Sequence, residues 1–298
     1  MTLQLQRKPH WLKVQAPGGA NYTFIKQKLR EKKLYTVCEE ASCPNMGECW
    51  KGGTATFMLM GDVCTRGCRF CHVASGKPTA LDAEEPQKIA SVISELGLTY
   101  VVLTSVDRDD LPDGGASHFA KTVAEIKKRN SNIIVESLIP DFQGRAESLK
   151  IMSNSGVDVL DHNIETIKRL SERVRDRRCS YGQSLFVLQR LKELNSKIYT
   201  KSSLMVGLGE TQEEASEVMD DLRTVGVDIL TIGQYLRPSH KQLEVKEYVA
   251  PAVFEHYRKL GESKGFLYVA SGPLVRSSYK AGEFFLEALI RSNNLLAL

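Results

Sequence analysis

Between residues 56 and 234 the chain alternates short apolar β-type runs with amphipathic helical stretches. The apolar runs predict strands at residues 56–60, 100–104, 132–137, 157–162, 199–205 and 227–234. The stretches between them predict helices at residues 84–96, 116–128, 143–153, 183–194 and 213–224. Strands that alternate with helices form right-handed βαβ units around a parallel sheet. The alternation therefore predicts an α/β fold.

About six such units are present, fewer than the eight of a closed barrel. We expect a partial (β/α)6 barrel in residues 56–240, open at one side so that a large substrate can enter. Residues 1–55 contain many helix-breaking Pro and Gly residues and are expected to form an N-terminal extension with one short basic helix at 22–33. A C-terminal extension is expected at 241–298, with a helix at 253–263, a strand at 267–270 and a helix near 281–291.

Composition excludes some classes of protein. A net charge of +4, with one dense basic run at 169–178, argues against a protein that binds nucleic acid through its phosphates. No stretch approaches about 18 consecutive apolar residues, so no membrane span is expected. The first residues lack the apolar core of a secretory signal. Together with closely spaced cysteines, which indicate a reducing compartment in a chain without a secretory signal, this predicts a cytoplasmic protein.

Six of the seven cysteines lie in two groups, which we call the first triplet (Cys38, Cys43 and Cys49) and the second triplet (Cys64, Cys68 and Cys71). Three closely spaced thiolates can bind three irons of a [4Fe–4S] cluster and leave the fourth iron for another ligand. Disulfides are disfavoured, because a chain of 298 residues with 42% hydrophobic residues can bury a core without them. Zinc is disfavoured because structural zinc sites complete a tetrahedron from pairs of ligands. Two triplets therefore indicate two clusters.

The second triplet follows the first predicted barrel strand, in a loop where the catalytic groups of βα barrels gather. Its CxxxCxxC spacing, with Phe70 before the last cysteine, resembles the signature of the radical S-adenosylmethionine superfamily. The resemblance implies that Cys64, Cys68 and Cys71 are catalytic, because they hold a cluster whose open iron binds S-adenosylmethionine. Electron transfer to that cofactor would release a 5′-deoxyadenosyl radical, a step that belongs to the cofactor rather than to the protein.

The first triplet has the spacing CxxxxCxxxxxC and, with Trp50 after it, resembles lipoyl synthases closely. Further matches run through most of the chain: Lys8-Pro9 with Trp11 to Lys13, 104–113 (TSVDRDDLPD), 161–166 (DHNIET), 201–211 (KSSLMVGLGET), 233–239 (GQYLRPS) and 272–279 (GPLVRSSY). The resemblance implies a sulfurtransferase that inserts two sulfur atoms at C6 and C8 of a protein-bound N6-octanoyl-lysine, giving N6-lipoyl-lysine.

That family implies a division of labour between two [4Fe–4S] clusters. The cluster of the first triplet would be a sacrificial sulfur source, and a serine of the Arg276–Tyr279 stretch would ligate its fourth iron. By position this role falls to Ser278, with Ser277 as the close rival. A serine oxygen is harder than a thiolate and a poorer match for cluster iron, so such a ligand would release readily.

The resemblance also implies partners. Substrates would be octanoylated lipoyl-carrier proteins, such as the glycine-cleavage H protein or the acyltransferase subunits of 2-oxoacid dehydrogenases. Ferredoxin or flavodoxin would supply electrons, and an iron–sulfur carrier would rebuild the consumed cluster. Neither a nucleic acid nor a membrane is expected as a partner.

Polar side chains recur where the predicted strands end at the barrel mouth. Any one of them is more often a surface or capping residue, but a set at one face favours a binding site. The predicted cofactor-binding residues are Thr104, Ser105, Asp107, Glu136, Asn163, Glu165, Lys201, Ser203, Gln234 and Tyr235.

Alternatives remain at this level. A radical methylthiotransferase also pairs two clusters, but it would carry an added nucleic-acid-binding module. A two-cluster electron carrier would need a fourth cysteine for each cluster, and only Cys179 is left over. Cys179 has no cysteine neighbour in the sequence and is predicted to be a plain thiol. Without the family match, the stretch from Arg276 to Tyr279 is more simply a turn whose serine caps a helix.

Overall fold

The structure, a computed structural model, describes residues 7–14, 16–51 and 56–278. Its main sheet has eight strands in the order β1-β2-β5-β6-β7-β8-β9-β10. All neighbouring pairs from β2 to β10 are parallel, whereas β1 pairs antiparallel with β2 at one edge. Because β1 and β10 are both edge strands, the described sheet does not close. The predicted α/β class and the partial barrel are confirmed.

The predicted elements are found with small shifts at their ends. The strands of the main sheet are β1 (Tyr35–Thr36), β2 (Thr56–Leu59), β5 (Tyr100–Ser105), β6 (Ile134–Leu138), β7 (Val159–Asp161), β8 (Tyr199–Val206), β9 (Ile229–Gln234) and β10 (Tyr268–Gly272). The longer helices are α1 (Ala20–Lys32), α4 (Glu85–Glu95), α5 (Ala116–Arg129), α6 (Ala146–Ser153), α8 (Tyr181–Leu194), α9 (Gln212–Thr224) and α10 (Pro251–Ser263). The helix predicted near 281–291 lies outside the described residues.

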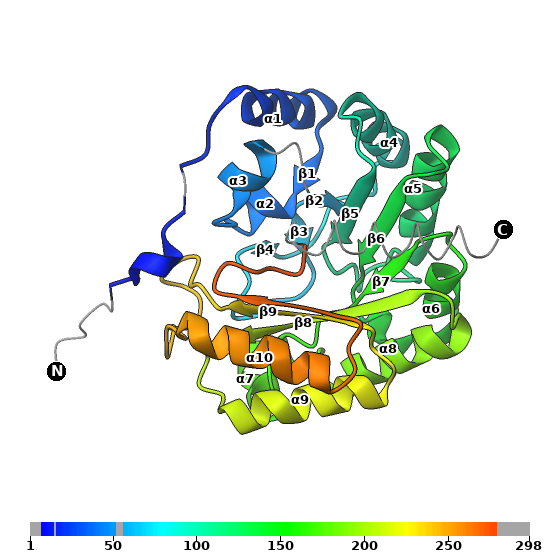
Figure 1. Cartoon of the computed structure of the whole chain (residues 1–298). Helices are drawn as coiled ribbons and strands as arrows, with labels where there is room; N and C mark the ends of the chain where they lie inside the picture. Colours follow the sequence, from blue (N-terminus) through cyan, green and yellow to red (C-terminus); the bar gives the residue numbers. More distant parts are fainter. Residues whose placement is uncertain (1–6, 15, 52–55, 279–298) are drawn as a thin grey trace.

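Helices α4, α5, α6, α8, α9 and α10 lie around the outside of the curved sheet, and α1 lies over one end of it (Figure 1). Local sequence signals set where some of them begin. Helix α9 starts with a capping box, in which Thr211 and Glu214 satisfy each other's backbone N–H groups. Helix α8 starts at Ser180, whose hydroxyl accepts a hydrogen bond from the Gln183 N–H. Each helix then buries its apolar stripe against the strands.

The lower end of the barrel is filled by side chains. Tyr100, Ile134, Val159 and Ile229 come from the first residues of strands β5, β6, β7 and β9 and belong to one buried apolar cluster. Side chains alternate between the two faces of a strand, so the next inward-facing residues lie about 6.6 Å higher. This apolar cluster fills the barrel at the amino ends of the strands, so the carboxyl ends of the strands form the open end of the barrel.

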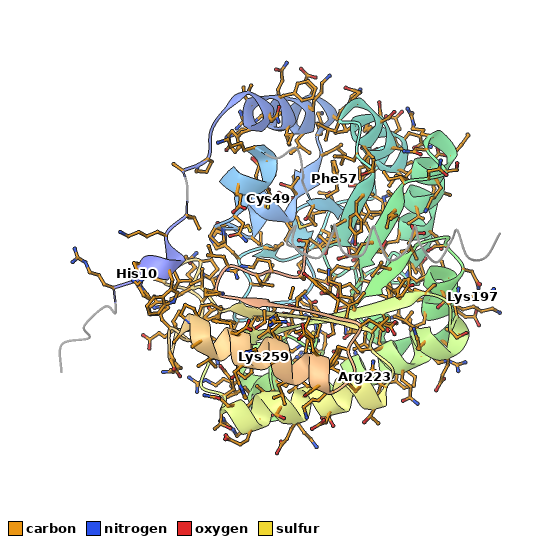
Figure 2. The ribbon with its side chains drawn as sticks, in the orientation of Figure 1. His10, Cys49, Phe57, Lys197, Arg223 and Lys259 are labelled. Carbon is orange, nitrogen blue, oxygen red and sulfur yellow. The ribbon has the colours of Figure 1, made fainter. Side chains whose placement is uncertain are left out.

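The N-terminal extension is more regular than its Pro and Gly content predicts. Besides the expected α1, it forms strand β1 and two short helices, α2 (Val37–Glu40) and α3 (Met46–Lys51). Trp50 of α3 is fully buried and packs against Tyr22 of α1, with ring centroids 5.0 Å apart. Figure 2 marks Cys49 on α3 and Phe57 on β2, and both belong to the main apolar core. Tertiary packing therefore orders helices too short to form alone.

The segment after β10 returns across the barrel mouth toward the N-terminal extension (Figure 1). Asn45 donates a hydrogen bond of 2.6 Å from Nδ2 to the Leu274 carbonyl, which joins residues 229 positions apart. The returning backbone lies directly over Gly233 of β9, where an added Cβ would stand 2.0 Å from the Val275 carbonyl oxygen. Only a residue without a side chain permits this approach.

We expect Glu85→Ala to destabilise the fold by about 2–4 kcal/mol, because it leaves buried donors unpaired. The Glu85 carboxylate accepts hydrogen bonds from the Met60 N–H at 2.9 Å and from His118 Nε2 at 2.6 Å, at the point where β2 enters the loop of the second triplet. Urea unfolding of the anaerobic protein measures the change. Glu84→Ala is the control, since Glu84 is exposed and only pairs with Lys88, and equal stability of the two variants would contradict the assignment.

Candidate active site

One cavity of about 440 Å³ lies at the open end of the barrel. Its wall combines the ends of strands β5 to β9, the second triplet, residues 41–44 of the first-triplet loop and residues 275–278. Segments from both termini and from the barrel therefore meet at one space. The volume is within the range of small-molecule sites.

The second triplet lies on a loop bracketed by two short parallel strands, β3 (Val63–Cys64) and β4 (Ala74–Ser75). Backbone N–H groups point at its sulfur atoms. The Arg66 and Asp107 N–H groups donate to Cys64 Sγ at 3.4 and 3.3 Å, and the Asp176 N–H donates to Cys68 Sγ at 3.3 Å. The Cys71 sulfur receives backbone N–H groups of its neighbours His72 and Val73. Such donors stabilise sulfur that carries negative charge.

Arg66, inside this loop, is buried and holds the loop to the barrel. Its guanidinium donates to both oxygens of Asp141, at 2.7 and 2.8 Å, and to both oxygens of Asp109, at 2.8 and 2.9 Å. Burial disfavours the charge of Asp109, but hydrogen bonds from Arg66 and Gln143 hold its pKa at about 2. Two paired carboxylates fix the planar fork in one orientation.

Burial keeps three thiols of the two triplets protonated when nothing else binds them. Burial raises the pKa of Cys38 to about 11 and that of Cys64 to about 12, the latter with help from the neighbouring Asp107 carboxylate. Burial also raises the pKa of Cys71. A metal-bound thiol must lose its proton, so these sulfurs need a positive partner in order to ionise.

The first triplet is spread over two helices and the turn between them. Cys38 on α2 and Cys49 on α3 are buried, and Cys43 in the turn lines the cavity. The turn is held by a hydrogen bond of 3.0 Å from the Cys43 N–H to the Cys38 carbonyl. Ser277 and Ser278 line the same cavity as Cys43.

No group of three His, Cys, Asp or Glu side chains within the described residues is arranged to hold one metal ion. A four-iron cluster binds each thiolate through a different iron. Its ligands therefore stand farther apart than those of a single ion.

Eight of the ten predicted cofactor-binding residues line the cavity: Thr104, Ser105, Asp107, Asn163, Glu165, Ser203, Gln234 and Tyr235. Ser105 Oγ and Asn163 Oδ1 are buried there without a hydrogen-bond partner. Unsatisfied buried polar atoms are costly, so they indicate a missing polar ligand or water. Glu165 stands in the left-handed backbone region, with φ of 66°, and burial raises the pKa of its carboxyl.

Two of these eight residues, Gln234 and Tyr235, use their polar atoms in hydrogen bonds with the backbone. The Gln234 amide donates from Nε2 to the Tyr235 and Glu247 carbonyls and accepts from the Val249 N–H. The Tyr235 hydroxyl donates to the Leu243 carbonyl. Both side chains hold the segment after β9 in place, and they border the cavity rather than point polar atoms at it.

Glu136 and Lys201 do not line the cavity. Lys201 Nζ lies 2.6 Å from Glu136 Oε1, Tyr100 donates to the other Glu136 oxygen, and both residues are buried inside the barrel. Ser203 and Met205 of the same strand do line the cavity, so Lys201 lies one inward-facing position deeper. The prediction placed both residues at the barrel mouth, Glu136 at the end of its strand and Lys201 on its strand, because the sequence does not show which layer of side chains faces the mouth.

Several residues of the wall were not predicted from the sequence. They are Arg66, Asp141, His162, Arg175, Cys179 and Arg276, together with others of the cavity lining. Burial lowers the pKa of His162 to about 4, so its ring is neutral. Nδ1 donates a hydrogen bond to the Ile139 carbonyl, and Nε2 is hydrogen-bonded to the Ser184 hydroxyl. Arg66 sits between two cysteines, and His162 and Arg276 lie in the family-matching stretches 161–166 and 272–279, so these three carried a signal in the sequence. Asp141, Arg175 and Cys179 belong to none of those stretches.

Similarity to known protein families and to solved structures shows which class of enzyme the chain belongs to. Residues 58–222 match the model of the radical SAM superfamily. The fold resembles methylornithine synthase, with a TM-score of 0.53 at 14% identity over 75% of this chain and 72% of that one. It also resembles the hydrogenase maturase HydG of Carboxydothermus hydrogenoformans, with a TM-score of 0.56 at 13% identity over 89% and 77%. The chain is a radical S-adenosylmethionine enzyme.

The particular family follows from closer matches. Residues 2–43 match the N-terminal domain of lipoyl synthase. The mitochondrial lipoyl synthase of Drosophila melanogaster is 58% identical over 295 residues, which cover 97% of this chain and 78% of that protein. The apicoplast lipoyl synthase of Plasmodium knowlesi is 56% identical over 286 residues, covering 96% and 65%. This chain belongs to the lipoyl synthase family.

Membership confirms the predicted activity, radical sulfur insertion that forms a lipoyl group, and the predicted cofactors, [4Fe–4S] clusters and S-adenosylmethionine. It favours neither the methylthiotransferase nor the electron carrier. Enzymes of this family act on lipoyl-carrier proteins.

The prediction of a cytoplasmic protein is wrong. The relatives are named mitochondrial in Drosophila melanogaster and Aedes aegypti and apicoplast in Plasmodium knowlesi, which points to an organelle. An organelle interior can also keep thiols reduced, so the cysteine argument did not distinguish it from the cytosol.

Within the described part of the chain, no helix combines the length and the apolar character needed to cross a bilayer.

Proposed function

We propose that the two triplets hold two clusters that face one another across the cavity. Cys64, Cys68 and Cys71 hold the cluster that binds S-adenosylmethionine. Cys38, Cys43 and Cys49, with Ser278, hold the cluster that gives up its sulfur. The observation that carries this proposal is the single cavity of about 440 Å³ whose wall includes Cys43, all of the second triplet and Ser278.

The residues fit these groups. Backbone N–H donors surround the sulfurs of the second triplet, as they do around cluster thiolates. The orphaned Ser105 Oγ and Asn163 Oδ1 are polar partners for the amino and carboxylate ends of a methionine moiety. When bound, the clusters and S-adenosylmethionine supply the electron, the carbon-centred radical and the sulfur.

The chain itself positions these groups and excludes water. Arg66 and its two carboxylate partners fix the second-triplet loop. The segment 272–278 closes the mouth, held by Asn45 and seated on Gly233. A closed, partly apolar cavity protects a radical from reaction with solvent.

A three-part division of the chain accompanies this arrangement. Residues 1–55 carry the ligands of the first triplet, residues 56–240 form the barrel core, and residues 241–298 form a C-terminal part that supplies the serine. Strands β1 and β10 extend the sheet from the two flanking parts.

The finer choice of partners follows from the family and from the proposed chemistry. The substrates are octanoylated carriers, namely the glycine-cleavage H protein and acyltransferase subunits of 2-oxoacid dehydrogenases. A ferredoxin or flavodoxin supplies electrons. An iron–sulfur carrier restores the consumed cluster.

The test of this assignment is a set of serine variants. Ser278→Ala is expected to keep cleavage of S-adenosylmethionine and to lose lipoyl product. Ser278→Cys is expected to bind the auxiliary iron more firmly and to release less sulfur, because thiolate suits cluster iron better than a serine oxygen does. Product is measured by mass spectrometry of an octanoylated carrier peptide, and cleavage by 5′-deoxyadenosine.

Ser277→Ala is the matched control, since Ser277 lines the same cavity one residue away. It is expected to retain product formation. Loss of product from Ser277→Ala but not from Ser278→Ala would transfer the ligand role to Ser277 and leave the two-cluster arrangement unchanged.

A further inference from the structure

Cys179 lies beside the second triplet, although 108 residues separate it from Cys71. Its side chain is 7% exposed and lines the same cavity as Cys64, Cys68 and Cys71. Arg66 Nη1 donates to its sulfur at 3.1 Å. The Cys68 and Cys179 side chains are hydrogen-bonded to each other. The isolated thiol predicted from the sequence therefore has a thiol partner.

Backbone contacts hold these two cysteines together. The Arg69 N–H donates to the Val174 carbonyl at 2.9 Å, and the Gly67 N–H donates to the Asp176 carboxylate at 2.8 Å. Asp176 then joins both cysteines: its N–H donates to Cys68 Sγ, and its carbonyl accepts the Cys179 N–H at 2.8 Å. The segment from 174 to 179 thus runs along the second-triplet loop and fixes Cys179 beside Cys68.

The other two cysteines of the triplet have different neighbours. Cys64 Sγ faces the Asp107 carboxylate, with Oδ2 at 3.7 Å, and receives two backbone N–H groups. Cys71 is surrounded by backbone donors from the residues that follow it. Within the described residues, Cys68 is the triplet member whose side chain is bonded to a cysteine outside the triplet.

We propose that Cys68 and Cys179 form a disulfide when the enzyme without its clusters meets a peroxide. One thiolate attacks the peroxide oxygen, giving a sulfenic acid and releasing water. The second thiolate then displaces the hydroxyl group as a second water, so two thiols and one hydrogen peroxide give one disulfide and two waters. The Arg66 guanidinium donates to the Cys179 sulfur and so holds it at its place beside the second-triplet loop.

The disulfide would act as a reversible modification of the cluster site. It removes Cys68 from the three thiolates of the second triplet, and a thiol reductant restores the free thiol. No cysteine of the first triplet takes part in the disulfide. This consequence rests on the proposed function, because it assumes that Cys68 is a cluster ligand, whereas the disulfide itself depends only on the contact between the two sulfurs.

The experiment uses the full chain, stripped of iron by a chelator under argon and checked for folding by circular dichroism. One equivalent of hydrogen peroxide is added, free thiols are alkylated, and peptides are analysed by mass spectrometry. A crosslink between the Cys68 and Cys179 peptides is expected as the main product. The same treatment in urea should lose this preference, because the fold is what brings the two residues together.

Cys179→Ser is the matched variant. After the same dose of peroxide its Cys68 should still be a free thiol and should therefore be alkylated. A main crosslink of Cys68 to Cys64 or Cys71, or a Cys179 that stays alkylated in the wild-type chain, would overturn the proposal. Such a result would leave the cluster assignment untouched.

Iron loading of the oxidised protein separates the two claims. Oxidised wild type is expected to take up roughly half of the iron bound by the oxidised Cys179→Ser variant, and dithiothreitol should restore the rest. Full loading of a protein that carries the crosslink would refute the ligand role of Cys68 while the disulfide stands.

Discussion

Replacing Cys64, Cys68 and Cys71 together by alanine is expected to reduce cleavage of S-adenosylmethionine to the background rate. No other three thiols of the described chain share one short loop at the carboxyl ends of the strands with backbone donors aimed at their sulfurs. Without these cysteines no iron is held where the cofactor binds, so S-adenosylmethionine cannot be cleaved to a radical. Chromatography of 5′-deoxyadenosine under dithionite measures the loss.

The control is Cys179→Ala, which removes a thiol from the same cavity and leaves all three cysteines of the second triplet in place. It is expected to cleave the cofactor and to form product like the wild-type enzyme. Measurable 5′-deoxyadenosine from the triple variant would mean that the reactive iron is held elsewhere.

Single replacements of Cys38, Cys43 or Cys49 by alanine are expected to separate the two halves of the reaction. The variants should still cleave S-adenosylmethionine, slowly, because the second-triplet loop is held by its own contacts with Asp109, Asp141 and Asp176. They should form no lipoyl product, because the sulfur source is gone. Both products are measured in one reaction with an octanoylated carrier peptide.

The informative result is that lipoyl product is lost while cleavage of S-adenosylmethionine is retained. A variant of the first triplet that inserts sulfur would show that the sulfur comes from another source, and it would remove the reason for a serine ligand. A variant that loses cofactor cleavage completely would show that the first triplet also supports the second. Cys38→Ala and Cys49→Ala carry a higher risk of misfolding, since both cysteines are buried in the core, so Cys43→Ala at the cavity wall is the cleaner case.

The barrel was predictable because its signal is repeated. Strands β5 and β9 are mostly apolar and almost wholly buried, as expected of strands covered on both faces, and the helices between the strands are amphipathic. The two-residue strand β1 and the helices α2 and α3 were missed because nothing in so short a segment has a period to detect. Their order comes from the packing of Cys49, Trp50 and Ile25 into the core.

The candidate site could be predicted where the spacing of residues along the sequence indicates their chemistry. Both triplets could be read directly, and the strand-end rule found Thr104, Asn163 and Ser203 at the cavity. The same rule misplaced Lys201, because a shift of two residues along a strand moves a side chain from the mouth into the barrel interior. The position of Cys179 beside Cys68 was not predicted for another reason: it is set by the path of residues 174–179 along the second-triplet loop, which no local pattern encodes.

The most direct test of the account is an iron and sulfide count, with Mössbauer spectra, on anaerobically purified wild type and on the variant in which Cys64, Cys68 and Cys71 are all alanine. The wild type should hold roughly eight irons in two four-iron clusters, and the variant should keep roughly four, still as an intact cluster on the first triplet. Loss of all the iron, or of none, would contradict the claim that the two triplets bind separate clusters.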